Sequence, residues 1–201
     1  GYHGSNTLVN SHSPLQVAQR RGWEITYSLG CEICDNMDGM PYGNNPCRAT
    51  MNEYNTSGFP QALAAVDAAD VVVLFLGADQ TTEAEGFDRH TLGLVGAQQQ
   101  LLDQVIQASA AKPTLTPVVL VLVNGGPIDV STAVESDVVV AILETFQPGE
   151  LGGDAMINIM DGTSSPSGKM PYTTYFANYT TGCVCVYVCW IGIAMWLPML
   201  R

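Results

Sequence analysis

Three short, almost entirely apolar runs constrain the fold of this chain more than any other feature. They occupy residues 70–76, 117–123 and 137–143, and none of them alternates apolar with polar residues. Such runs predict strands that are buried on both faces of a sheet. Stretches with helical periodicity separate them, the clearest at residues 96–110. Buried strands that alternate with helices imply a parallel sheet covered on both sides. The sequence therefore predicts a three-layer α/β/α sandwich with a mostly parallel sheet.

Caps, prolines and alternation place the remaining elements. Ser13 and Ser57 can each cap a helix that has a proline near its start. The expected helices cover residues 13–21, 60–66, 128–134 and 153–159. Alternation predicts a strand at residues 23–28, and residues 168–175 resemble an edge strand, where proline is tolerated.

Charge excludes two classes of partner. The 201 residues carry a net charge of −12, with 7 basic and 19 acidic side chains and no basic cluster. Nucleic acids and anionic membrane surfaces both require a positive footprint, so neither is an expected partner.

An apolar fraction of 47% is ample for a buried core. The chain starts without Met or a signal peptide, and we expect it to be an interior piece of a longer protein.

Cysteines and glycines give no sign of a metal or a nucleotide. The pair Cys31-x-x-Cys34 lacks a second pair or a histidine at ligand spacing, so zinc is not expected. A disulfide that involves Cys47 is the better interpretation if the protein is secreted. Sequons at Asn55 and Asn178 fit secretion. Neither nucleotide-binding glycine fingerprint is present, no cofactor is expected, and residues 124–127 predict a tight turn beneath a neighbouring element.

The end of the chain differs from the rest. Residues 183–200 contain no charged side chain over 18 positions, which is the lower limit for a membrane span. Gly192, Pro198 and many β-branched and aromatic residues favour a buried segment or a piece foreign to the fold. Residues 1–179 are therefore expected to form the domain, and residues 180–201 an apolar tail whose nature stays open.

Charged residues gather directly after the first apolar run. They are Asp79, Glu83, Glu85, Asp88 and Arg89. Burying so many charges is costly, and ligands of open α/β sheets bind beyond the carboxyl ends of strands. One interpretation is a solvated loop that an Asp–Arg pair holds in shape. The other is a glycosidase site, which needs one carboxyl as general acid and a second to attack the sugar.

Six motifs occur in a fixed order along the chain and favour the second interpretation. They occupy residues 13–16, 76–89, 96–101, 118–130, 148–155 and 166–171. Their order and content resemble the second domain of glycoside hydrolase family 3. Residues 79–89 form an acidic segment. Its first part, Asp-Gln-x-x-Glu-Ala-Glu at residues 79–85, is similar to the corresponding sequence in the β-xylosidase and α-L-arabinofuranosidase branch of that family.

The resemblance implies a mechanism and a partner domain. Family members are retaining enzymes in which a (β/α)₈-type barrel supplies the aspartate nucleophile, and the sandwich supplies the acid/base glutamate. The family pattern Glu-Gly-aromatic-Asp-Arg falls on residues 85–89, so Glu85 is the expected acid/base and Glu83 the second candidate. Asp88 and Arg89 are expected to shape the loop, and Asp79 to do so or to bind sugar hydroxyls. No barrel lies within these residues, so we expect them to be inactive alone.

Three functions follow from these observations. The first is the acid/base-donating domain of a secreted, cell-wall-directed glycosidase that acts on xylo-oligosaccharides. The second is a non-catalytic sugar-binding or remnant module of the same fold. The third is an interaction domain that residues 183–200 anchor to a membrane.

Overall fold

The computed structural model describes residues 12–33, 55–79, 82–83, 89 and 91–181. Helices and strands alternate through most of this part of the chain. The elements are α1 (Pro14–Arg20), α3 (Phe59–Ala68), β1 (Val72–Gly77), α4 (Gln98–Ala111), β2 (Val118–Val123), α5 (Ser131–Val134), β3 (Val139–Glu144), α6 (Gly152–Met160) and the 3-10 helix η1 (Ala177–Thr181). All three apolar runs are strands, as predicted.

The strands form one parallel sheet in the order β1-β2-β3. Gly77 pairs with Val123 at the carboxyl end of the first pair of strands. A register shift between β2 and β3 leaves Val140 outside the pairing, and its side chain is exposed. Because the strands are parallel, their carboxyl ends lie together at one end of the sheet, called here the carboxyl edge. The loops that begin at residues 78, 124 and 145 leave the sheet there.

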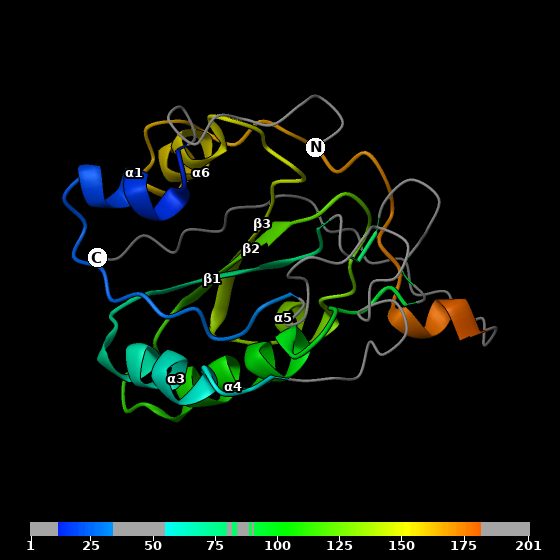
Figure 1. Ribbon diagram of the computed structural model, residues 1–201, viewed down its shortest axis with the longest axis horizontal. Helices are drawn as coiled ribbons and strands as arrows, with labels where there is room; N and C mark the ends of the chain where they lie inside the picture. Colours follow the sequence, from blue (N-terminus) through cyan, green and yellow to red (C-terminus); the bar gives the residue numbers. More distant parts are fainter. Residues whose placement is uncertain (1–11, 34–54, 80–81, 84–88, 90, 182–201) are drawn as a thin grey trace, which may run out of the picture.

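Helices cover both faces of the sheet, which confirms the predicted sandwich (Figure 1). On one face, α3, α4 and α5 pack on β1 and β2 through one continuous apolar cluster. The helical pattern at residues 96–110 explains this contact, since Leu101, Leu102 and Val105 are buried along one side of α4. This face holds the main core of the domain.

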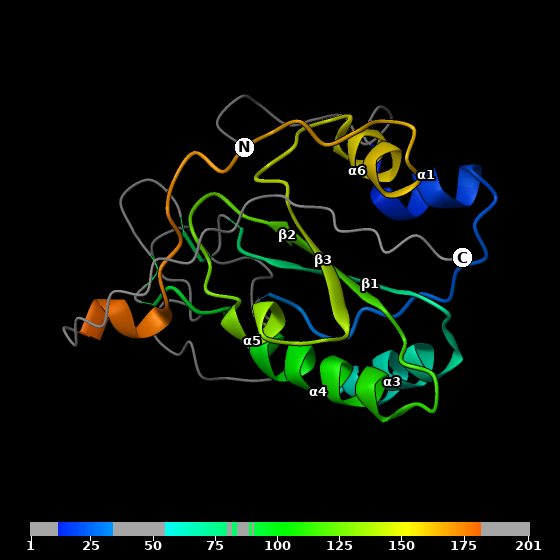
Figure 2. The ribbon, with the colours of Figure 1, turned by 180° about the vertical axis from the view of Figure 1, so that it is seen from behind.

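The other face is covered by two helices from opposite ends of the described chain (Figure 2). α6 packs on β2 and β3 through Met156, and α1 lies against α6 through Val17 and Ala18. Ser13 caps α1 as predicted: its hydroxyl accepts from the Gln16 backbone, while the Gln16 side chain accepts from the Ser13 backbone. This reciprocal arrangement is a capping box.

Several local predictions are wrong. Residues 23–28 and 168–175 form no strand in the described part of the chain. Trp23 and Tyr27 are exposed, because alternation forms a strand only where a partner strand and a covering layer are available. Helix α3 begins after Gly58, without a side-chain cap from Ser57. Burial on both faces holds for β2 but not for β1, where Phe75 is 41% exposed.

The apolar tail lies outside the described residues from position 182 onwards. Among the described residues, no helix is both long and apolar enough to cross a bilayer.

Candidate functional site

The site begins where β1 ends. Gly77 lies so close to β2 that an added Cβ would come within 1.9 Å of the Val123 carbonyl oxygen, so only glycine fits. The buried Gln98 side chain accepts from the Gly77 amide at 2.7 Å and donates to its carbonyl at 2.8 Å. The backbone amides of Thr82 and Glu83 then donate to the Asp79 carbonyl. Asp79 thus begins a turn that brings Glu83 back over the sheet edge.

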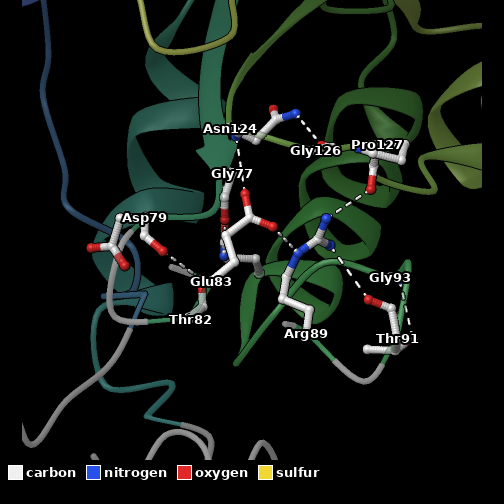
Figure 3. A network of polar contacts seen from close by, with 12 residues as sticks. Gly77, Asp79, Thr82, Glu83, Arg89, Thr91, Gly93, Asn124, Gly126 and Pro127 are labelled. Atoms are coloured by element: carbon white, nitrogen blue, oxygen red, sulfur yellow. Dashed lines mark hydrogen bonds and ion pairs between the residues drawn. The ribbon is translucent and has the colours of Figure 1, made fainter. Parts of the chain in front are cut away.

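Glu83 accepts hydrogen bonds at both carboxylate oxygens (Figure 3). Oε1 accepts from the backbone amide of Gly125 at 3.0 Å, and Oε2 accepts from Nε of Arg89 at 2.7 Å. The ion pair is shielded from solvent, with the Arg89 side chain 6% exposed. Glu83 therefore anchors the acidic segment (residues 79–89) to the loop that follows β2 (residues 124–127, the β2 loop).

Arg89 fixes the other end of the acidic segment. Its Nη2 donates to the Pro127 carbonyl at 2.8 Å, and its Nη1 donates to the Thr91 carbonyl at 3.4 Å (Figure 3). A buried guanidinium needs several acceptors, and one carboxylate with two carbonyls supplies them. Residues 84–88 are therefore bracketed by an ion pair between Glu83 and Arg89.

The two glycines of the β2 loop make room for this pair. A Cβ on Gly125 would come within 3.0 Å of Glu83 Oε1, and one on Gly126 within 3.5 Å of Arg89 Nη2. The chain bends at these two glycines, as predicted, but two side chains lie over them rather than a neighbouring element. A larger residue at position 125 would push the Glu83 carboxylate away from the Gly125 amide, whereas the 3.5 Å approach at Gly126 is an ordinary contact.

A polar cluster lies behind the turn. The Nδ2 group of the fully buried Asn124 donates to the Gly126 carbonyl at 2.6 Å and to Glu144 Oε2 at 3.4 Å. Glu144 Oε1 accepts from the Phe146 amide at 3.0 Å. Burial raises the pKa of Glu144, although the hydrogen bonds from Phe146 and Asn124 oppose that rise.

Two aromatic residues, Phe146 and Tyr172, lie beside Glu144 in this cluster. Phe146 has a φ of 52°, a left-handed conformation that costs a non-glycine residue about 1–3 kcal/mol. Its ring contacts Tyr172 edge to face, with centroids 5.9 Å apart. Burial, followed by the nearby charge of Glu144, raises the pKa of Tyr172 to about 12. Backbone strain of this kind persists where the surrounding structure overdetermines it.

The structure brings together part of the predicted site. Glu83 and Arg89 form the ion pair, and Asp79 accepts the turn hydrogen bonds through its backbone. Glu85 and Asp88 lie outside the described residues, as do Cys34 and Cys47. Sequence reasoning missed Asn124, Glu144, Phe146 and Tyr172. The one available signal was the polar Glu144 at the end of an apolar strand.

The described part of the site fixes the acidic segment on both sides, at Glu83 and at Arg89. Within the described residues, no three His, Cys, Asp or Glu side chains converge as metal ligands would. What the site provides is a short acidic segment whose two ends are fixed to a rigid sheet edge. Catalytic groups need positioning of this kind, because their reach and angle decide whether a proton can transfer.

Comparison with known proteins finds xylosidases among the relatives of this chain. The chain is 47% identical over 122 residues to beta-D-xylosidase 1 of Arabidopsis thaliana, covering 61% of this chain and 15% of the relative. It is 40% identical over 165 residues to a "probable exo-1,4-beta-xylosidase" of Neosartorya fischeri, covering 82% of this chain and 18% of the relative. The chain thus spans less than a fifth of the length of these relatives.

Structural comparison agrees with the sequence matches. A solved GH3 exo-beta-xylosidase, in complex with a xylobiose aziridine activity-based probe, superimposes with a TM-score of 0.69 at 29% identity. The superposition covers 84% of this chain and 19% of that enzyme. The family model described as "Glycosyl hydrolase family 3 C-terminal domain" matches residues 1–183. The resemblance drawn from the motifs is confirmed, and the chain belongs to the glycosyl hydrolase family 3 C-terminal domain family.

Proposed function

We propose that this chain is the acid/base-donating domain of a retaining glycosidase that acts on xylo-oligosaccharides. Three observations support the proposal: family membership, relatives named as xylosidases, and a short acidic segment fixed at the carboxyl edge of the sheet. A barrel domain of the same family would supply the nucleophile and most of the sugar pocket. The domain comprises residues 1–179, and residues 180–201 form a tail outside it.

Glu85 is the proposed acid/base. The observation that carries this choice is the state of Glu83, whose two oxygens already accept from Gly125 and Arg89. Glu83 would have to leave both partners before it could carry a proton to a leaving group. Glu85 lies between the anchored residues 83 and 89, in the family pattern at 85–89. It would protonate the glycosidic oxygen and then activate water against the glycosyl intermediate.

The test joins this chain to a family barrel and compares two substrates. Glu85→Gln should lower kcat on xylobiose by about 10²–10⁴-fold, because its leaving group needs a proton. On a dinitrophenyl xyloside, which needs no such proton, the first step, reported by kcat/KM, should fall far less. Asp161→Asn, remote from the acidic segment, serves as the control. Equal losses of kcat/KM on both substrates would refute Glu85, and xylobiose binding without hydrolysis by the parent would favour a non-catalytic module.

We also propose that the protein acts outside the cell. Asn55 and Asn178 head the two sequons, and both side chains are exposed. Enzymatic removal of N-glycans from protein made in a secretory host should lower its mass, and Asn55→Gln with Asn178→Gln should abolish that change. An unchanged mass of the secreted parent would contradict glycosylation at these sites.

A further inference from the structure

The β2 loop that anchors the acidic segment is itself held from behind. Asn124 is fully buried, and its Nδ2 group donates to the Gly126 carbonyl at 2.6 Å. That bond fixes the turn whose Gly125 amide contacts Glu83 and whose Pro127 carbonyl contacts Arg89. Displacement of Asn124 would therefore move both attachment points of the acidic segment together.

Glu144 sets the position of Asn124. Its Oε2 lies 3.4 Å from Asn124 Nδ2, and its Oε1 accepts from the Phe146 amide at 3.0 Å. The Phe146 carbonyl in turn accepts from the Asn124 backbone amide at 3.2 Å. Three residues thus form a closed set of contacts across the ends of β2 and β3, with Phe146 held at a φ of 52°.

We propose that Asn124 and Glu144 are positioning residues, which act through the Gly125–Pro127 turn to place the acidic segment and its acid/base carboxyl. This inference rests on the proposed function of that segment. Neither side chain touches the substrate in this mechanism. Asn124 acts on the turn, and Glu144 acts on Asn124 and on the backbone of Phe146.

The proposal predicts a selective kinetic effect. A catalytic group must be held to within about 0.5 Å of its productive geometry, and a misplacement of about 1 Å can cost a factor of about a hundred. Displacement of an acid harms substrates that need protonation more than substrates that do not. A general loss of folded protein would instead lower the rate on every substrate equally.

The first experiment measures backbone amide exchange in the full 201-residue chain. Asn124→Ala removes the donor to the Gly126 carbonyl, and Glu144→Gln leaves a single acceptor oxygen for two donors, Asn124 Nδ2 and the Phe146 amide. Both should speed exchange of the Gly125 amide at least about tenfold, while the Val105 amide in α4 stays protected. Gln99→Ala, which removes only exposed contacts to Asp103 and Thr132, is the matched control. Unchanged Gly125 exchange in Glu144→Gln would overturn the proposal, even if Asn124→Ala fails to fold.

The second experiment uses the chain joined to a family barrel. Both variants should lower kcat on xylobiose about tenfold to a hundredfold with little change in KM, and should lower kcat/KM, which reports the first step, much less on a dinitrophenyl xyloside. Equal losses of kcat/KM on the two substrates would overturn the positioning role. Failure of the proposed function has a different signature: Glu85→Gln would show no dependence on the leaving group, while the exchange result would still report whether Asn124 and Glu144 hold the turn.

Discussion

The two faces of the sheet are built in different ways. On the α3/α4 face, elements that follow one another along the chain share one continuous apolar cluster with β1 and β2. On the α1/α6 face, the helices come from residues 14–20 and 152–160, and their apolar contacts form two small clusters. The first face can form from nearby segments, whereas the second needs the two ends of the domain to meet. Stability should therefore reside mainly in the first face.

Polar contacts accompany the two small apolar clusters on the second face. The His12 side chain pairs with Asp154, and Arg21 pairs with Asp161. The Thr163 hydroxyl, followed by its backbone amide, lowers the pKa of Asp161. These contacts are partly exposed, and exposed ion pairs contribute little to stability. These ion pairs set how α1 is aligned against α6, and they add little to the free energy that keeps the two helices together.

Truncation of a core side chain on each face gives the largest contrast. Leu102→Ala should lower the free energy of unfolding by about 4 kcal/mol, because the tightly packed α3/α4 face cannot collapse into the cavity. Ile157→Ala should cost about 2 kcal/mol, since α1 can move toward α6. Urea denaturation measures both changes. Equal losses would show that the two faces are packed equally well.

A second change tests whether α1 can detach alone. A Cβ on Gly153 would come within 2.0 Å of the His12 carbonyl oxygen, which now accepts from the Gly153 amide at 3.1 Å. Gly153→Ala should cost about 1–3 kcal/mol, as overpacking does, and should release α1. Amide exchange should accelerate in α1 but not in β2. Gly168→Ala is the control, because a Cβ there meets nothing within 4 Å. Accelerated exchange in β2 of the Gly153→Ala variant would show that α1 does not detach independently of the sheet.

The smallest expected effect is the pH dependence of stability that Glu144 contributes at the carboxyl edge of the sheet. Burial raises the pKa of Glu144 above its ordinary value of 4.5, so the folded chain binds a proton more tightly than the unfolded chain does. The stability that this provides is complete below the unfolded pKa and is lost as pH rises through the folded pKa. Tyr172, with its pKa raised to about 12, stays protonated there. Glu144→Gln should remove this decline in pH-dependent denaturation, and an unchanged decline would assign it to other groups.

Local periodicity was enough to predict the layers. The apolar runs and the pattern of α4 depend on residues a few positions apart, and these were predicted correctly. Residues 23–28 were predicted wrongly because alternation reports a preference for pairing, not the presence of a partner. The Glu83–Arg89 pair was out of reach for another reason. Glu83 reaches Arg89 through the turn at Asp79 and the space left by the glycines of the β2 loop, and neither is visible in the local pattern; Asp88 lies outside the described residues.

The contacts that join Asn124, Glu144 and Phe146 could not be predicted from the sequence. Asn124, Glu144 and Phe146 meet only because β2 and β3 end side by side in a particular register. The φ of 52° at Phe146 is set by that arrangement and leaves no mark in local sequence preference, which favours glycine at such a position. Long-range geometry determines the candidate site, and local sequence determines the scaffold beneath it.

The Glu83–Arg89 pair also determines how the acidic segment can vary. Glu83 and Arg89 are both held by the β2 loop, so the contacts that fix the two ends do not depend on how many residues join them. Doubling the length of a flexible loop costs only about 0.6 kcal/mol. Insertion of a few residues between Glu83 and Arg89 should therefore cost the sandwich little free energy of unfolding, provided that the ion pair is kept.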